Sequence, residues 1–330
     1  MTAAGAAILG CAGPRLDQSE RAFFRDADPW GFILFARNVE DPAQVVALTA
    51  ELRETVGRAA PILIDQEGGR VQRLGPPHWR AWPPPLDLAA SADPVRAFWL
   101  RYRLIAAELT DLGIDVDCAP LADIAGPNTH PFLRNRCYGT DAAAVILRAR
   151  AAADGLAAGG VLPVLKHIPG HGRAVADSHA DLPIVEADPE TLRATDFAPF
   201  RALADLPMAM TAHVVYRGLG SEAPATTDPA MIALIRDELG FDGLLMSDDI
   251  AMGALVGDMA ARSAAAIAAG CDVVLHCNGD RAEMAQVIAA AGTLGGAGER
   301  RAAAALAARA APDELDIAAL EAELSDLCGG

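Results

Sequence analysis

Short apolar runs recur along the chain, and each is followed by polar or glycine-containing residues and then by a segment with helical spacing. Most of these runs are apolar at nearly every position, which is typical of strands buried on both faces of a parallel sheet. The runs are "AAILG" (6–10), "GFILF" (31–35), "PILID" (61–65), "IDVDCAP" (114–120), "VLPVLKH" (161–167), "MAMTAHV" (208–214), "GLLMSDD" (243–249) and "DVVLHCN" (272–278). We therefore predict eight parallel strands.

The segments between the runs are rich in Ala, Leu, Arg and Glu, as in "PAQVVALTAELRETVG" and "PAMIALIRDELG". Eight alternations of strand and helix predict an α/β fold, a single (β/α)8 TIM-type barrel. A doubly wound open sheet is the alternative, but no G-x-G-x-x-G follows the first run. The Ala-rich segment 281–326 predicts closing helices. We expect residues 1–330 to form a single catalytic domain.

Polar residues stand at or just after the C-terminal ends of most predicted strands. In a barrel these ends meet at one rim, where long loops build the active site. The connections after 61–65, 114–120 and 161–167 are long, so we expect long loops on this face. The strand-end residues are Asp65, Asp117, Asp123, Lys166, His167, His213, Asp248, Asp249 and His276.

The N-terminal stretch "MTAAGAAILGCAG" has two interpretations. "ILGC" faintly resembles a lipoprotein cleavage site, but no basic residue precedes it and the apolar stretch is very short. We therefore predict that Ala6–Gly10 forms the first buried strand.

Composition narrows the classes of partner. The net charge of −17 disfavours nucleic acid, because a basic surface is the main sequence-independent route to phosphates. No run of about 18 apolar residues lacks a charge, so we expect no membrane span. The six cysteines form no C-x-x-C pair, which is typical of reduced thiols in a cytoplasmic protein. A monomer is the default expectation.

The segment "KHIPGHGRAVADSHAD" (166–181) holds three of the seven histidines, which raises the possibility of a zinc site. His167, His171 and His179 would be its ligands. The first two have the spacing that chelates zinc on a helix. Pro169 and Gly170 lie between them and make a helix improbable, so we expect no metal; activity that resists chelators would test this.

The same segment holds the only lysine of the chain, Lys166, which suggests a Schiff-base enzyme instead. A nucleophilic lysine must be desolvated or lie near a cation to lose its proton. The acidic groups expected around Lys166 would hold that proton. Borohydride trapping with a keto substrate would reveal a Schiff base on Lys166.

An ordered set of motifs resembles the family 3 glycoside hydrolases, in particular the bacterial β-N-acetylglucosaminidases of peptidoglycan recycling. The motifs are "DQEGGRVQRL" (65–74), "KHIPGHG" (166–172), "DSH" (177–179), "MTAHV" (210–214) and "SDD" (247–249). The resemblance covers roughly residues 5–300. It implies a TIM-type barrel, no metal or organic cofactor, and a small carbohydrate or muropeptide substrate.

By this resemblance, Asp248 is the nucleophile that forms a covalent glycosyl-enzyme in a retaining reaction. Successive side chains of a strand point to opposite faces, so we expect only one of Asp248 and Asp249 to face the site. His179 matches the general acid/base and Asp177 its dyad partner. An imidazole suits this work because it titrates near neutral pH.

The resemblance also implies the substrate ligands. Hydrogen bonds from charged groups to sugar hydroxyls can strengthen in the oxocarbenium-like transition state. The implied ligands are Asp65, Arg136, Lys166 and His167. Arg134 competes with Arg136, because the preceding "AGPNTHPFLRN" is unusual for the family. His171 and His213 are assigned supporting roles, and Arg70 a structural one.

Alternatives remain within the family and outside it. β-Glucosidases and β-xylosidases commonly carry a second α/β domain that supplies a glutamic acid, whereas this chain has "DSH" and no such domain is expected. Transfer to phosphate instead of water is a second possibility, because a histidine acid/base does not repel phosphate. A non-catalytic sugar-binding barrel is a third. We expect an exo-acting enzyme for muropeptides such as N-acetylglucosaminyl-1,6-anhydro-N-acetylmuramic acid.

Overall fold

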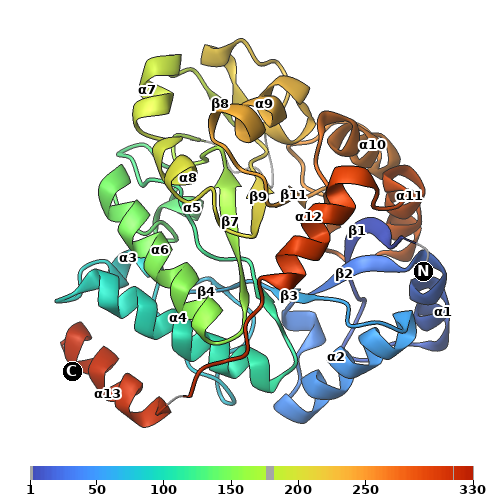
Figure 1. The fold of residues 1–330 in the computed structure, drawn as a ribbon, viewed down its shortest axis with the longest axis horizontal. Helices are drawn as coiled ribbons and strands as arrows, with labels where there is room; N and C mark the ends of the chain where they lie inside the picture. The colour runs from blue at the N-terminus through green and yellow to red at the C-terminus, as the bar shows by residue number, and fades with distance from the viewer. Residues whose placement is uncertain (1–2, 176–181, 315, 330) are drawn as a thin grey trace.

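Eight parallel strands close into a barrel in the computed structural model, which describes residues 3–175, 182–314 and 316–329 (Figure 1). The strands are β1 (Gly5–Gly10), β2 (Pro29–Leu34), β3 (Ile62–Ile64), β6 (Val116–Asp117), β7 (Leu162–Ile168), β9 (Met208–Thr211), β11 (Leu244–Asp249) and β12 (Val273–His276). Their order around the barrel is β1-β12-β11-β9-β7-β6-β3-β2. Each strand lies within or beside one predicted run, so the barrel prediction is confirmed.

Helices surround the barrel and follow the strands along the chain (Figure 1). The longer ones are α1 (Gln18–Ala27), α2 (Pro42–Val56), α4 (Pro94–Asp111), α6 (Ala142–Ala158), α10 (Met259–Ala269) and α11 (Arg281–Ala291). Shorter ones are α3 (Pro85–Leu88), α5 (Pro131–Arg134), α7 (Pro189–Ala194), α8 (Ala198–Ala202) and α9 (Pro229–Ala233). Two small two-stranded sheets, β4 (Gln66–Gly68) with β5 (Val71–Gln72) and β8 (Ile184–Val185) with β10 (Val215–Tyr216), lie in the loops.

Aspartates define where most of the long helices begin. The side chains of Asp41, Asp93 and Asp141 each accept a hydrogen bond from the backbone N–H three residues later, at the starts of α2, α4 and α6. Such caps satisfy backbone donors that the first helical turn leaves unpaired. The same spacing recurs at Asp258 and Asp280, before α10 and α11. Local sequence therefore fixes the helix starts independently of the barrel.

The strands are buried on both faces, as their apolar composition predicts. All six residues of β1 and all seven of β7 are buried. Cys11 directly follows β1 and is buried as well, which places "ILGC" inside the barrel. Among the described residues, no helix combines the length and apolar character needed to cross a membrane.

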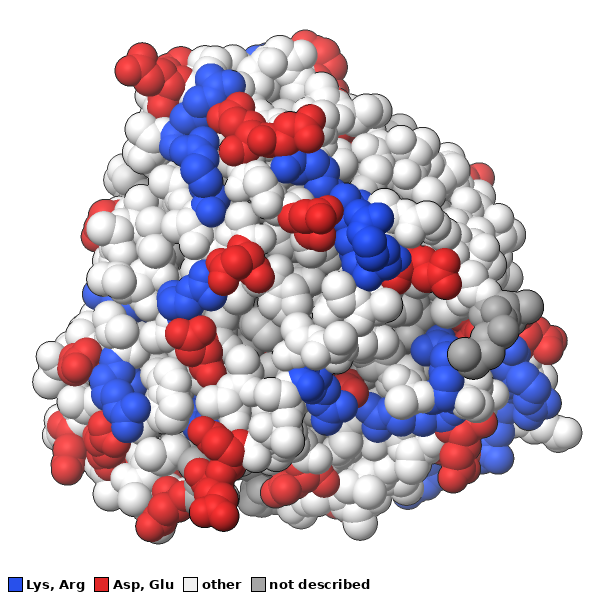
Figure 2. All heavy atoms as spheres, in the orientation of Figure 1, with Lys and Arg blue, Asp and Glu red and all other residues white. Residues whose placement is uncertain are grey.

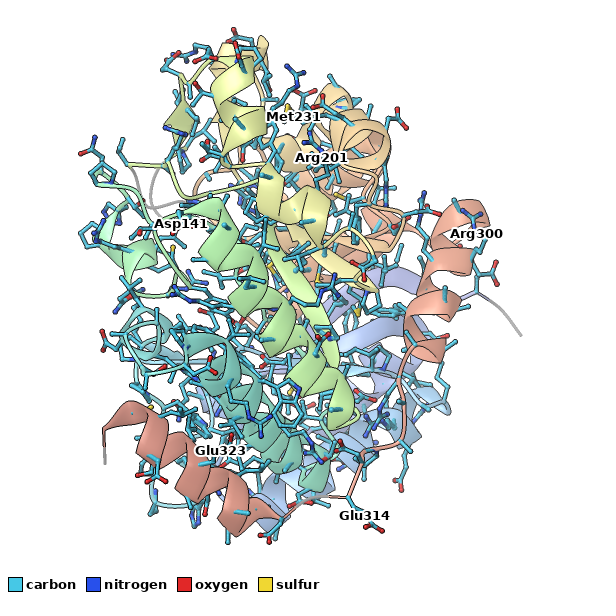
Figure 3. The ribbon with its side chains drawn as sticks, turned by 60° about the vertical axis from the view of Figure 1, so that its left-hand side comes forward. Asp141, Arg201, Met231, Arg300, Glu314 and Glu323 are labelled. Carbon is cyan, nitrogen blue, oxygen red and sulfur yellow. The ribbon has the colours of Figure 1, made fainter. Side chains whose placement is uncertain are left out.

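Two further helices end the described chain, α12 (Gly296–Ala307) and α13 (Ile317–Cys328). The helix α13 lies against α4, where Glu323 pairs with Arg96 at 2.7 Å (Figure 3). The prediction of closing helices over 281–326 is thus confirmed as three helices, α11 to α13. On the face shown in Figure 2, basic and acidic groups lie beside one another.

Candidate active site

A cavity of about 210 Å³ opens at the C-terminal ends of the barrel strands. Strand-end residues form its floor, and the loops after β3, β6 and β7 form its walls. Its lining residues are Ile33, Phe35, Asp65, Arg70, Val71, Arg73, Phe132, Leu133, Arg136, Lys166, His167, His171, Met210, Asp248, Asp249, Met252, Leu275 and Cys277. The expected convergence at one rim therefore brings together Asp65, Arg136, Lys166, His167 and Asp248.

One wall of the cavity is a buried network of alternating charges. Lys166 Nζ lies 2.9 Å from Asp65 Oδ1 and 2.6 Å from Glu67 Oε1. Arg136 donates two 2.8 Å hydrogen bonds to the two carboxylate oxygens of Glu67. Arg73 bonds the other oxygen of Asp65 at 2.9 Å. Each carboxylate is thus held by two cations, which fixes the direction in which the cationic groups point.

These contacts set the protonation states. Burial alone raises the pKa of Asp65 and Glu67, but Lys166 and the neighbouring arginines outweigh it and hold both pKa values below their usual range. Burial likewise disfavours charge on Lys166, but Asp65 and Glu67 raise the pKa of its ammonium well above its ordinary value. Lys166 therefore keeps its proton, which a Schiff-base nucleophile must lose.

Replacing Lys166 by methionine should damage both stability and activity. The change leaves Asp65 and Glu67 buried with one cation fewer each, so we expect the free energy of unfolding to fall by about 3 kcal/mol. We expect kcat/KM to fall on the order of 100-fold, because Lys166 is one of the predicted charged ligands of the substrate. Urea unfolding and steady-state kinetics measure the two effects.

The control for this prediction is Arg150→Met. Arg150 pairs with Asp205 on the surface, so its loss should change the free energy of unfolding by less than about 1 kcal/mol. Equal effects of the two substitutions on stability would contradict the role of the buried network.

The second wall centres on His167. Its Nδ1 lies 2.8 Å from Asp123 Oδ2, and its Nε2 lies 4.0 Å from Asp248 Oδ2. Asp123 also accepts the backbone N–H groups of His167 and His171, at 3.2 and 2.6 Å. Burial lowers the pKa of the His171 imidazole to about 4, so this ring is neutral at pH 7. His213 lies behind the cavity, bonded to Thr226 and to the Asp249 carbonyl.

Both Asp248 and Asp249 line the cavity, so the expectation that only one would face it is wrong. The physical reason is a register shift between β11 and β12, which occurs between Met246 and Asp249 and breaks the regular alternation. The two carboxylates still differ in their contacts. Asp249 Oδ1 accepts the backbone N–H groups of Ala251 and Cys277. Asp248 Oδ1 accepts only the N–H of Asp249 among the bonds to described residues, and its Oδ2 faces His167.

The pKa values of the two carboxylates also shift in opposite directions. Burial and the charge of Asp248 raise the pKa of Asp249. Burial raises the pKa of Asp248 too, but its electrostatic interactions with His167 and His213 and the N–H bond from Asp249 more than offset this, so the net shift is downward. Asp248, at the floor of the cavity, is therefore ionised at neutral pH.

The structure distinguishes the two candidate arginines. Arg136 lines the cavity, whereas Arg134 donates to the carbonyl of Gly126 and is not part of the lining. Arg70, for which we expected a structural role, lines the cavity as well, with its guanidinium 4.0 Å from the centre of the Phe132 ring.

Asp177 and His179 lie outside the described residues, which omit 176–181. Of the three histidines considered for zinc, His167 and His171 lie with ring centres 5.6 Å apart. Within the described ranges, no three His, Cys, Asp or Glu side chains group in a way that could hold a metal ion.

Sequence reasoning missed Glu67, Arg73 and the apolar part of the wall. Glu67 and Arg73 belong to "DQEGGRVQRL", in which we predict a substrate-binding role only for Asp65. One sequence signal was available, because Glu67 stands two residues after the strand-end Asp65. Phe132 lies in the short helix α5 and Met252 in the loop after β11, and neither stands in a recognisable sequence pattern.

Asp117 ends β6 behind the charge network, and burial raises the pKa of its carboxyl to about 7 from the usual 3.8. Between pH 4 and 7 the folded protein therefore holds a proton that the unfolded chain has released, so this group makes stability fall as pH rises. The full difference corresponds to roughly 4 kcal/mol. In Asp117→Asn this loss should be absent, and the free energy of unfolding at pH 8 should rise by about 2 kcal/mol or more.

Urea unfolding of both proteins at pH 5 and pH 8 measures this effect. The Asn side chain can still accept the Gln66 N–H that Asp117 Oδ1 accepts at 3.0 Å. The exposed Asp326→Asn serves as the control, and its stability should depend on pH in the same way as that of the wild type. An unchanged pH dependence in Asp117→Asn would contradict the buried, protonated carboxyl.

Comparisons with known proteins place these observations in context. Residues 8–305 match the model described as "Glycosyl hydrolase family 3 N terminal domain". A curated "Beta-hexosaminidase" from Bordetella avium is 36% identical over 283 residues, covering 83% of this chain and 81% of that protein.

Two solved structures have the same fold. The family 3 beta-N-acetylglucosaminidase from Paenibacillus sp. str. FPU-7 is 28% identical with a TM-score of 0.85, covering 98% of this chain and 67% of that one. NagZ from Neisseria gonorrhoeae in complex with N-trifluoroacetyl-D-glucosamine is 28% identical with a TM-score of 0.80, covering 99% of each chain.

Proposed function

The chain belongs to glycosyl hydrolase family 3, and on this premise we propose that it is an exo-acting β-N-acetylglucosaminidase that removes terminal β-linked N-acetylglucosamine from peptidoglycan fragments. Membership of the family makes the chain a glycoside hydrolase. The finer assignment is supported by the curated relative named beta-hexosaminidase. Two solved structures also support it, one of a beta-N-acetylglucosaminidase and one of NagZ in complex with N-trifluoroacetyl-D-glucosamine.

The observation that carries the proposal is the ionised Asp248 at the floor of the cavity, with the opposite wall formed by Lys166, Arg136 and Asp65. The carboxylate attacks the anomeric carbon as the bond to the leaving oxygen breaks, and a glycosyl-enzyme forms. Water then attacks the same carbon, and the bonding electrons return to Asp248. Two inversions give net retention of configuration.

The proton for the leaving oxygen comes from His179 in this proposal, with Asp177 as its partner. The support is the "DSH" motif at 177–179, since these residues are outside the described structure. Once the leaving group has departed, the same imidazole takes the proton of the attacking water.

The charged wall supplies directional contacts to sugar hydroxyls. Asp65 can accept hydrogen bonds, while Lys166, Arg136 and His167 can donate them. The cavity of about 210 Å³ is smaller than the roughly 300–1,000 Å³ of most ligand sites, which suits one sugar unit and hence exo action. We further propose a cytoplasmic, monomeric enzyme without metal or organic cofactor.

Hydrolysis of aryl β-N-acetylglucosaminide, compared with the aryl β-glucoside and β-xyloside, tests the sugar preference. We expect the N-acetylglucosaminide to have the highest kcat/KM, and a preference for glucoside or xyloside would overturn the assignment. Adding inorganic phosphate and looking for sugar 1-phosphate distinguishes phosphorolysis. Release of N-acetylglucosamine from N-acetylglucosaminyl-1,6-anhydro-N-acetylmuramic acid tests the natural substrate.

The remaining alternative class, a Schiff-base aldolase, predicts that borohydride and a keto substrate give a covalent adduct on Lys166. The ion pairs of Lys166 with Asp65 and Glu67 oppose this, because they stabilise its protonated form.

A further inference from the structure

Asp123, in the loop after β6, holds the segment that forms the second wall of the cavity. Its side chain is fully buried and is not part of the cavity lining, so it acts on the site through other residues. Oδ1 accepts the backbone N–H of His171 at 2.6 Å. Oδ2 lies 2.8 Å from Nδ1 of the His167 ring and accepts the backbone N–H of His167 at 3.2 Å. One carboxylate thus holds the end of β7 and the start of the following loop.

This contact decides where the proton sits on the His167 ring. Burial raises the pKa of Asp123, but the charge and hydrogen bond of His167 lower it below the usual value, so Asp123 is ionised. An ionised carboxylate can only accept a hydrogen bond, so Nδ1 must carry a proton. The other nitrogen, Nε2, then faces Asp248 Oδ2 at 4.0 Å.

We propose that Asp123 is a positioning residue for the nucleophile: by fixing the proton on Nδ1 of His167, it directs Nε2 toward Asp248 and allows the ring to become a cation beside that carboxylate. The inference rests on the proposed role of Asp248. A cation at Nε2 keeps Asp248 ionised before it bonds to the anomeric carbon. It also stabilises the returning negative charge when water attacks and the bond from Asp248 to that carbon breaks.

The variant D123N tests this with almost no change in shape. Its amide nitrogen cannot accept a hydrogen bond, so the amide oxygen is best placed toward the His171 N–H, the shortest of the three contacts. The amide NH2 then donates to Nδ1 of His167. Nδ1 must stay unprotonated, so the ring carries its single proton on Nε2 and cannot become a cation without breaking this bond.

The kinetic readout is a series of aryl β-N-acetylglucosaminides with leaving groups of increasing pKa. We expect D123N to lose kcat/KM on the order of 100-fold, by a similar factor across the series, because the nucleophile acts on every substrate. Wild-type activity in D123N would overturn the inference. A loss of kcat/KM that grows with leaving-group pKa would also overturn the inference, because it would mean that Asp123 affects proton donation to the leaving oxygen through the His171 N–H.

A double-mutant cycle separates positioning from a general structural effect. If Asp123 acts through His167, adding D123N to His167→Gln should cost little further activity, whereas independent roles would give multiplied losses. Asp115→Asn is the matched control. Asp115 is a buried carboxylate immediately before β6, bonded to Arg53 and Arg309, so its loss should lower stability and leave kcat unchanged.

A measurement on the wild-type protein keeps the inference testable if D123N does not fold. Nitrogen-15 NMR of histidine-labelled protein, with the His167 signals assigned from their loss in His167→Gln, reports which ring nitrogen carries a proton. We expect a protonated Nδ1, and a ring protonated only on Nε2 would overturn the inference. This result is independent of substrate: a wild-type protein with no glycosidase activity refutes the proposed function, whereas an active wild type with an unaffected D123N refutes only the role of Asp123.

Discussion

Replacing Asp248 by alanine should lower turnover of an aryl β-N-acetylglucosaminide by about 10⁴-fold or more, as expected for loss of a nucleophile. The reason is geometric and electrostatic. Asp248 is the ionised carboxylate at the floor of the cavity, facing His167, whereas one oxygen of Asp249 is taken up by two backbone N–H groups. Steady-state kinetics measures the loss, and the surface variant Asp326→Ala should retain wild-type turnover.

Azide makes this test specific to the nucleophile. In Asp248→Ala, azide can enter the space left by the carboxylate and attack the anomeric carbon from the α face while the leaving group departs. We expect partial recovery of rate with an activated substrate and an α-glycosyl azide as product. Near-wild-type turnover of Asp248→Ala without azide, or an α-glycosyl azide from Asp249→Ala instead, would contradict the assignment.

Replacing His179 by alanine should have an effect that depends on the leaving group. With an alkyl or sugar leaving group, protonation of the departing oxygen is essential, so we expect a loss of kcat/KM on the order of 10³-fold. With an activated nitrophenyl leaving group the loss should be about 10-fold, because the phenolate departs without a proton. A plot of log kcat/KM against leaving-group pKa measures this, and it should be steeper for His179→Ala than for the wild type.

Azide again gives an independent readout. In His179→Ala the glycosyl-enzyme still forms from an activated substrate, and azide attacks it from the β face without needing a base. The expected product is a β-glycosyl azide, opposite in configuration to the product of Asp248→Ala. A slope equal to that of the wild type would mean that another residue is the acid.

Much of the fold could be predicted from the sequence because buried strands are recognisable from short apolar stretches. A strand in the centre of a parallel barrel is apolar on both faces, so β7 and β12 can be recognised from a few residues. The strand β6 was the hardest to locate from the sequence, because it has only two residues inside the predicted 114–120. Aspartate caps and positive-φ glycines such as Gly57, at the end of α2, mark helix boundaries in the same local way.

The site was predicted only in part. Strand-end position identified Lys166, His167 and Asp248, because parallel strands end at a common rim. Strict alternation failed at Asp249, because the register shift between β11 and β12 depends on the neighbouring strand. Glu67 was missed because its value as a counter-ion appears only when Lys166 and Arg136, distant in sequence, are folded against it.

By itself, the sequence determined the order of strands and helices, the barrel and the residues that can reach its C-terminal rim. These follow from hydrophobic periodicity and capping, which act over a few residues. Only the tertiary structure decided which charges meet. It paired Lys166 with Glu67, placed Arg136 rather than Arg134 at the cavity, and set His167 between Asp123 and Asp248. Such contacts join separate strands and loops, so their distances and protonation states depend on how the closed barrel brings those segments together.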